Sequence, residues 1–324
     1  MQKRHLLALS AAMALAALGA PQGANAQVGK QQMRMVLATV PGSAPDVIAR
    51  LIAEQFRIKF GQPVLVENKP GAGGIIAVNY AKAGDANGTV LLFAQAAVAV
   101  VTPNTFKEAK YDVERDFETV GVVASTPMMF VANLDKGPKT WAEAVVDAKS
   151  SPDKLVLGSP NRTSIPHLAG ELAGQSVGGS FRNVPMSNTG QGLQAVVNGD
   201  THMYVDGIAA VLPLVRAGRI RPLAVTAEKV LPGLEAYPLA HDVIPKFDVS
   251  GWFMLFANKG TPQPVLEKLN AAMNEAVQSP EIIAKMAEFG TYPVGGSVAD
   301  GTAFLKHEKV VWSDVIKRAG FTAE

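Results

Sequence analysis

One short segment has the residue types and spacing of an anion-binding turn. The run from Thr39 to Asp46 (TVPGSAPD) lies between a predicted strand and a predicted amphipathic helix. Ser43 and Asp46 have the spacing of a capping box, in which both side chains accept hydrogen bonds from backbone N–H groups. The free N–H groups and the positive dipole end of a helix N-terminus suit an anion. On this segment alone, an ordinary strand-to-helix turn with a good cap is the better interpretation.

Later loops repeat this placement of polar residues after a strand. The loop 159–164 (SPNRTS) follows one predicted strand, the loop 187–192 (SNTGQG) follows the next, and Asp206 ends a third. Arg162 can bind a carboxylate through two hydrogen bonds, although an exposed loop arginine is an equally good interpretation. Ligands of open parallel sheets bind beyond the carboxyl ends of the strands, so these loops meet if two lobes face each other.

Other chemical motifs are incomplete. The glycine run at 71–74 has Ile76 where a dinucleotide fingerprint needs its third glycine, so no nucleotide cofactor is predicted. His167 and Glu171 share a helix face, but a first-turn histidine more often caps or packs than binds metal. The sequence holds no H-E-x-x-H motif. We therefore predict no catalytic residue, no metal and no cofactor.

The composition excludes several functional classes. The 324 residues are 48% hydrophobic and 18% charged, which is typical of a globular protein. The 30 basic and 28 acidic side chains nearly balance, so the chain lacks the positive field that would hold nucleic acid phosphates. Cysteine is absent, which excludes disulfides, thiol catalysis and Cys-ligated metal.

Residues 1–26 have the pattern of a secretory signal. Lys3 and Arg4 precede an apolar run of 13 residues, Leu6–Leu18, and the small-x-small site Ala24–Ala26 follows. A membrane anchor is the alternative, but a span needs about 20 apolar residues. We predict cleavage before Gln27, a periplasmic location and a mature chain without a membrane span.

Strands and helices alternate along most of the chain. The predicted strands are Arg34–Val40, Pro63–Glu67, Thr89–Ala94, Leu155–Gly158, Phe181–Pro185, Met203–Asp206 and Pro222–Thr226. Apolar residues repeat at helical spacing from Val47 to Phe60, and Gly61 ends this helix. Three further helices are predicted at 264–278, 280–289 and 299–318. This order predicts an α/β fold with parallel-rich sheets flanked by helices.

At about 150 residues per domain, the chain length suggests two domains or one large one. No repeat or Gly/Ser linker separates two halves, so the helical tail is expected to return to the first domain. We expect lobe 1 to comprise residues 27–124 and 251–324, and lobe 2 to comprise residues 125–250.

The chain resembles the substrate receptors of tripartite tricarboxylate transporters, the periplasmic Bug family. The matching stretches are VPGSAPDVIARLIAEQF, GQPVLVENKPGAGG, LVLGSPNRTSIPHLAGELA, NGDTHMYVDG, AGRIRPLAVTAEK and FANKGTPQPVLEKLN. The resemblance implies a type II periplasmic-binding-protein fold, in which two lobes with mixed, largely parallel sheets close over a central cleft. It also implies that a di- or tricarboxylate or an aromatic acid is captured for the transporter's membrane subunits. A monomer is expected because the lobes must move freely.

The resemblance also places ligand-binding residues in loops of both lobes. Carried over by position, they are Gly42, Ser43, Ala44, Asp46, Gln95, Ser159, Asn161, Arg162, Thr163, Ser164, Asn188, Thr189 and Asp206. Ser43 stands where the family usually has the second glycine of PGG, and Arg162 enters a loop that is usually small. These departures leave the fold unchanged and put the identity of the ligand in doubt.

Two other functional classes fit parts of the same pattern. A receptor that reports ligand to a signalling kinase would need the same fold and pocket. A periplasmic hydrolase using Ser159 or Ser164 is less favoured, because the sequence shows no nucleophile paired with a base.

Overall fold

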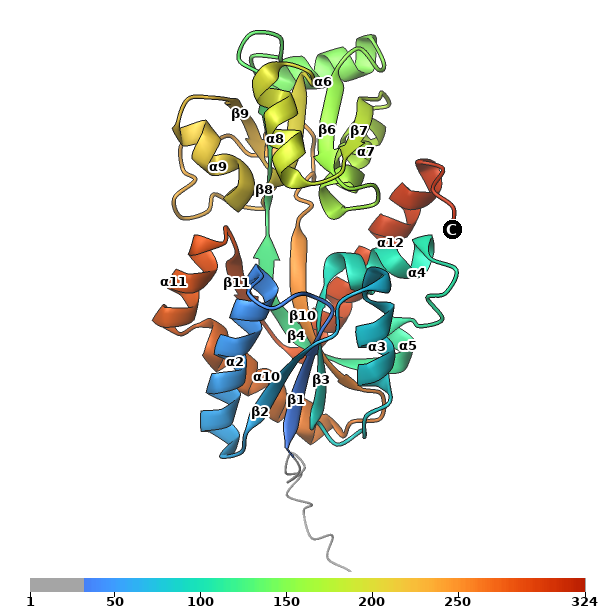
Figure 1. Cartoon of the computed structure of the whole chain (residues 1–324), viewed down its shortest axis with the longest axis vertical. Helices are drawn as coiled ribbons and strands as arrows, with labels where there is room; N and C mark the ends of the chain where they lie inside the picture. The colour runs from blue at the N-terminus through green and yellow to red at the C-terminus, as the bar shows by residue number, and fades with distance from the viewer. Residues whose placement is uncertain (1–31, 324) are drawn as a thin grey trace, which may run out of the picture.

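Two β-sheets, each flanked by helices, form two lobes stacked along the long axis of the molecule (Figure 1). The computed structural model describes residues 32–323. The predicted signal segment, residues 1–26, lies outside the described residues. Within residues 32–323, no helix combines the length and apolar character needed to cross a membrane. The two-lobed α/β fold expected from the sequence is confirmed.

The sheet of lobe 1 has six strands in the order β11-β4-β10-β3-β1-β2. These strands are β1 (Met33–Leu37), β2 (Val64–Asn68), β3 (Val90–Gln95), β4 (Phe117–Thr126), β10 (Gly251–Asn258) and β11 (Tyr292–Gly295). β1 pairs in parallel with β2 and β3, whereas β10 runs antiparallel to β3 and β4. The sheet is therefore parallel on one side and antiparallel where the chain crosses to lobe 2.

The sheet of lobe 2 has five strands in the order β7-β6-β8-β5-β9. These strands are β5 (Met128–Ala132), β6 (Val156–Pro160), β7 (Arg182–Met186), β8 (Met203–Gly207) and β9 (Arg221–Val225). β6 is parallel to β7 and β8, while β5 is antiparallel to β8 and β9. Both sheets are mixed, as expected. They are not largely parallel, because lobe 1 has two parallel and three antiparallel pairs and lobe 2 has two of each.

Helices cover both lobes. In lobe 1 they are α2 (Ala44–Phe60), η1 (Ala72–Gly74), α3 (Ile75–Lys82), η2 (Ala97–Val101), α4 (Thr102–Thr105), α5 (Val113–Asp116), α10 (Gln263–Val277), α11 (Pro280–Glu288) and α12 (Val298–Arg318). In lobe 2 they are α6 (Trp141–Ser150), α7 (Ile165–Ser176), α8 (Thr189–Asn198), α9 (Ile208–Arg216) and η3 (Ala240–Asp242).

The sequence of α2 explains both which face of the helix is buried and where the helix ends. Ile48, Ile52 and Phe56 recur at helical spacing and are fully buried. Gly61 ends the helix with a φ of 66°, and its N–H donates to the carbonyl of Arg57. This helix holds the first predicted ligand loop at its N-terminus.

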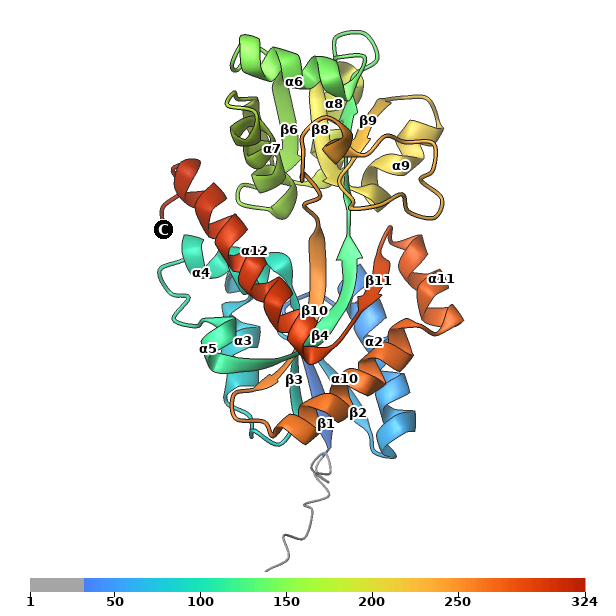
Figure 2. The ribbon, with the colours of Figure 1, turned by 180° about the vertical axis from the view of Figure 1, so that it is seen from behind.

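The chain passes from one lobe to the other at two places, and a third element contacts both lobes. β4 leads into β5 through Pro127, and the segment after β9 returns through β10. The third element is α12, which starts beside lobe 1 and ends against α7 of lobe 2 (Figure 2). The lobe limits predicted at residues 124/125 and 250/251 stay a prediction.

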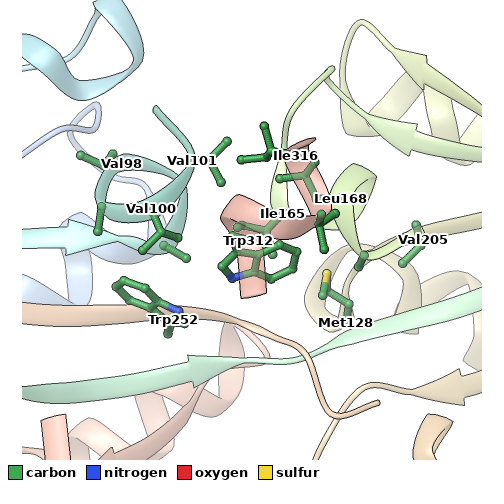
Figure 3. Close-up of a cluster of buried hydrophobic side chains, with 14 of the residues drawn as sticks. Val98, Val100, Val101, Met128, Ile165, Leu168, Val205, Trp252, Trp312 and Ile316 are labelled. Carbon is green, nitrogen blue, oxygen red and sulfur yellow. The ribbon is translucent and has the colours of Figure 1, made fainter. Parts of the chain in front are cut away.

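An apolar cluster joins the two lobes beside α12. Trp312 and Ile316 of α12 lie between Val101 of η2 and the α7 residues Ile165 and Leu168 (Figure 3). All five side chains are buried. The hydrophobic core is therefore continuous from one lobe to the other on this side.

Candidate ligand-binding site

A cavity of about 290 Å³ lies between the lobes and is lined by both of them. The six-stranded sheet and the start of η2 contribute Gln95, Ala96, Ala97, Thr126, Gly251, Trp252 and Phe253. Lobe 2 contributes Met128, Ser164, Ile165, Pro166, Asp206 and Gly207. Sites for small molecules are typically concave, mostly apolar and placed between domains, with a few polar groups that fix orientation.

The lobe 2 wall is the first turn of α7. The Ser164 hydroxyl donates to the Pro160 carbonyl and accepts a hydrogen bond of 3.2 Å from the N–H of His167, so it caps the helix. Pro166 has no N–H. The N–H of Ile165 has no acceptor among the described residues, which leaves a free backbone donor at the cavity.

The lobe 1 wall comes from the ends of β3 and β4 and the start of β10. Gln95 is half-buried, and its carboxamide makes no hydrogen bond within the described chain. Trp252 and Phe253 of β10 are buried against the cavity. The Trp252 Nε1 donates a hydrogen bond of 2.7 Å to Oε2 of Glu308 in α12, and this bond fixes the position of the indole ring.

Asp206 lies one residue before the end of β8 and is the charged side chain of the cavity lining. Its Oδ2 accepts from the Thr189 hydroxyl at 2.8 Å and the Tyr204 hydroxyl at 2.9 Å, and its Oδ1 accepts from the N–H of Gly207. Burial raises the pKa of Asp206, and these three hydrogen bonds oppose the rise. Asp206 therefore links Thr189, the first residue of α8, to the cavity lining by a hydrogen bond.

Comparison with known proteins identifies the family. Residues 48–321 match the tripartite tricarboxylate transporter family receptor, which is most of the chain. The chain belongs to this family. Its members are periplasmic solute-binding proteins rather than enzymes, and they work with transporter membrane subunits.

The similarity to individual relatives extends over most of each chain. The chain is 27% identical to the protein BugT of Bordetella pertussis, over 98% of both chains. It is 28% identical, with a TM-score of 0.72, to the solved R. palustris protein Rpa4515 with adipate, covering 91% of this chain and 99% of that one. It is 26% identical, with a TM-score of 0.67, to MatC from Rhodopseudomonas palustris with bound malate, covering 88% and 98%.

The structure pairs a serine with a histidine that the sequence did not indicate as partners. The Ser159 hydroxyl lies 2.9 Å from Nδ1 of His167, and Oε1 of Glu171 lies 3.9 Å from Nε2. Ser159 is fully buried and His167 is 3% exposed, so no substrate reaches this pair. Burial and the charge of Arg162 lower the pKa of His167 to about 4. In this receptor the pair fastens the end of β6 to α7, and no group of three metal-binding side chains occurs among the described residues.

The hydrogen bonds at the N-terminus of α2 differ from those of the predicted capping box. The Ser43 hydroxyl does not cap α2 but contacts the Thr39 hydroxyl at 2.8 Å and donates to the Val40 carbonyl. Asp46 accepts instead from the N–H of Gly42 at 2.8 Å, one residue before the expected partner. The capping box predicted for Ser43 and Asp46 was therefore wrong, because the hydroxyl is committed to the preceding loop.

Asp46 holds this loop together. It is 2% exposed and accepts hydrogen bonds from the Arg50 guanidinium and the Asn68 amide. Burial acts to raise the pKa of Asp46, but hydrogen bonds from Arg50, Gly42 and Asn68 outweigh it and lower the pKa. The N–H of Ala44 has no acceptor within residues 32–323. The role of this loop in binding stays a prediction.

The remaining predicted residues lie outside the cavity lining in this conformation. The Arg162 guanidinium lies 5.1 Å from the centre of the Phe321 ring, in the segment after α12. Asn161 and Thr163 have left-handed φ values of 37° and 60°. Asn188 caps α8 by accepting from the N–H of Gln191 at 2.9 Å. Of the predicted residues, the structure brings Gln95, Ser164 and Asp206 together at the cavity, and ligand contact by any of them stays a prediction.

A larger hollow of about 680 Å³ lies on lobe 1 between α4, α5 and α12. Four of its five charged side chains pair with neighbours; Lys309 Nζ, for example, lies 2.9 Å from Asp112 and 2.7 Å from Glu114. Residues of lobe 1 alone line it, so closure of the two lobes cannot enclose a ligand there.

Proposed function

We propose that the receptor captures a small carboxylate in the cavity between its lobes and delivers it to the membrane subunits of a tripartite tricarboxylate transporter. The ligand class is a di- or tricarboxylate or an aromatic acid. The observation that carries this proposal is the cavity lined by both lobes, with the unpaired N–H of Ile165 at the start of α7. The adipate and malate held by two solved relatives support it.

Binding proceeds by closure of one lobe on the other. A carboxylate first meets the N–H groups at the start of α2 or α7, where the helix dipole favours negative charge. Closure then brings the second lobe to the other end of the ligand. The ligand stabilises the closed state only through contacts made there and not in the open state. Reversible capture suits a Kd of about 1 μM, which corresponds to about −8 kcal/mol.

Further parts of the proposal concern the chain as a whole. Cleavage before Gln27 releases a monomer into the periplasm. Residues 27–124 with 251–324 move as lobe 1, and residues 125–250 move as lobe 2. The predicted ligand loops at 42–46 and 159–164, with Asn188 and Thr189, approach the ligand on closure.

A thermal-shift screen tests the proposed ligand class. Because a ligand that binds only the folded state raises the melting temperature, at least one of citrate, malate, adipate and benzoate should raise Tm in proportion to log concentration. No shift with any mono-, di- or tricarboxylate, or chemical turnover of the ligand, would reject the proposal. With a ligand in hand, Ser43→Leu should weaken binding tenfold or more, and unchanged affinity would remove the first loop from the site. Loss of growth on that ligand after deletion separates uptake from sensing.

A further inference from the structure

The two lobes contact each other on both sides of the strands that cross between them. The apolar cluster of α12 lies on one side of these strands, and the turn that joins α11 to β11 lies on the other (Figure 1, Figure 2). Gly290 in this turn and Tyr292 at the start of β11 face residues of lobe 2. Neither Gly290 nor Tyr292 lines the cavity between the lobes.

Gly290 lies directly against the first turn of α9. Its φ of 56° is left-handed, and a Cβ atom here would lie 2.8 Å from the backbone nitrogen of Ala209 and 3.3 Å from Cβ of Ile208. Non-bonded atoms do not approach as closely as 2.8 Å, so glycine alone lets the two backbones meet here. Asp206 and Gly207, which immediately precede α9, line the cavity. The contact therefore sets the position of one cavity wall.

Tyr292 makes a second contact with lobe 2, two residues further along the chain. Its ring packs on the apolar cluster of lobe 2 that contains Ile208 and Val211. Its hydroxyl donates a hydrogen bond of 3.2 Å to the Pro232 carbonyl. Tyr292 also pairs with Ser125 of β4, close to the point where the chain crosses to lobe 2. Tyr292 thus connects the edge of the six-stranded sheet to the other lobe.

The two contacts differ in how completely they are buried. Trp312 and Ile316 on the α12 side are buried, whereas Tyr292 is half-buried and Ala209 is exposed. The cost of uncovering apolar surface rises with its area, so the α12 contact resists separation more strongly. A movement that parts the lobes therefore breaks the contact made by Gly290 and Tyr292 and leaves the α12 contact covered.

We infer that Gly290 and Tyr292 are positioning residues for ligand capture, which form the contact that brings the lobes together beside the cavity. The closed arrangement has this contact, and the open arrangement lacks it. Both residues act through the cavity wall at Asp206 and Gly207. This inference rests on the proposed capture of a carboxylate between the lobes, and it assigns residues outside the cavity that govern how far the cavity closes.

Two glycine variants isolate the contact. Gly290→Ala adds the Cβ that collides with α9. Gly218→Ala is the matched control, because both glycines follow a helix with left-handed φ and donate to a carbonyl three residues earlier, but a Cβ at Gly218 meets no atom within 4 Å. The probe is whichever of citrate, malate, adipate and benzoate raises Tm most. The apparent Kd follows the closed fraction, so calorimetry should show binding weakened by about tenfold in Gly290→Ala and by less than about twofold in Gly218→Ala.

The lobe arrangement can also be measured without any ligand. The chain holds no cysteine, so Ile283→Cys in α11 and Gln194→Cys in α8 place spin labels at two exposed positions in opposite lobes. Pulsed electron paramagnetic resonance should show longer distances after Gly290→Ala and the unchanged distribution after Gly218→Ala. If none of the four acids binds, the proposed function fails, and these distances still decide whether Gly290 holds the lobes together.

Tyr292→Phe tests the second contact, because it removes the hydrogen bond to Pro232 and keeps the ring. Tyr237→Phe is its control, since Tyr237 packs on the same cluster and its hydroxyl makes no hydrogen bond within the described chain. Tyr292→Phe should weaken binding by several-fold and Tyr237→Phe should not. Tighter or unchanged binding in Gly290→Ala, equal losses in both glycine variants, or longer distances with unchanged affinity would overturn the inference.

Discussion

The indole Nε1 of Trp252 in β10 donates a hydrogen bond of 2.7 Å to Oε2 of Glu308 in α12, and the same oxygen accepts from Nε1 of Trp312 at 2.8 Å. All three side chains are buried. Burial raises the pKa of Glu308, and the two indole hydrogen bonds oppose the rise. One carboxylate thus connects the cavity wall to the helix that bridges the lobes.

Replacing Glu308 by alanine should be strongly destabilising. The change leaves two buried indole N–H groups without an acceptor, at about 1–3 kcal/mol each, so the free energy of unfolding should fall by about 2–6 kcal/mol. Urea unfolding followed by tryptophan fluorescence measures it. Glu288→Ala is the control, because Glu288 forms an exposed ion pair with Lys285 and such pairs contribute at most about 1 kcal/mol. Equal losses in the two variants would contradict the role given to Glu308.

His167 should make stability depend on pH. Its pKa is lowered from 6.5 to about 4, first by burial and then by the charge of Arg162. Between pH 4 and pH 6.5, His167 binds a proton in the unfolded chain but not in the folded chain. The contribution of this group to the free energy of unfolding is therefore fully present above pH 6.5 and decreases as the pH falls toward 4. The loss attributable to this group is up to roughly 3 kcal/mol.

One variant isolates this contribution. His167→Asn should flatten the dependence of the free energy of unfolding on pH between 6.5 and 4. Denaturant titrations at several pH values compare its slope with that of the wild-type receptor. A His167→Asn receptor with the wild-type slope would assign the pH dependence to other groups.

Ser164→Ala should affect both stability and binding. The hydroxyl caps α7, and loss of such a cap costs about 1 kcal/mol. Because Ser164 also lines the cavity, the Kd for the preferred carboxylate should rise several-fold. Ser279→Ala is a matched control, since Ser279 caps α11 and does not line the cavity. The two variants should lose similar stability, and a fall in affinity in both would point to a global effect.

Arg162→Ala should act on the C-terminal segment rather than on the ligand. A cation over an aromatic ring contributes about 0.5–1 kcal/mol, and this stability should be lost while the Kd changes less than twofold. In a double-mutant cycle, Phe321→Leu should abolish the stability effect of Arg162→Ala. A tenfold loss of affinity would instead restore the ligand contact that the resemblance predicts for Arg162.

The fold was predictable where polar turns separate parallel strands from amphipathic helices. All seven strands predicted from the sequence occur, with ends shifted by a few residues. The strands β4, β5, β10 and β11 were missed. β5 and β10 pair antiparallel with their neighbours, so they fall outside the strand–helix–strand pattern from which the other strands were predicted.

The residues of the candidate site were also predicted only in part. The rule that ligands bind beyond the carboxyl ends of parallel strands led to Ser164 and Asp206, and the family resemblance added Gln95; all three line the cavity. Neither reached Thr126, Met128 or Trp252, because these lie on the segments that cross between the lobes. The buried contact of Ser159 with His167 was also invisible, since their pairing depends on how α7 packs on β6.

The position of Trp312 and Ile316 limits how the molecule can open. These side chains are buried against η2 of one lobe and α7 of the other (Figure 3). Pulling the lobes straight apart would expose this apolar contact to water, at about 25 cal/mol for each Å² uncovered. Any separation of the lobes on the side away from the C-terminal helix would keep this contact covered and so uncover less apolar surface.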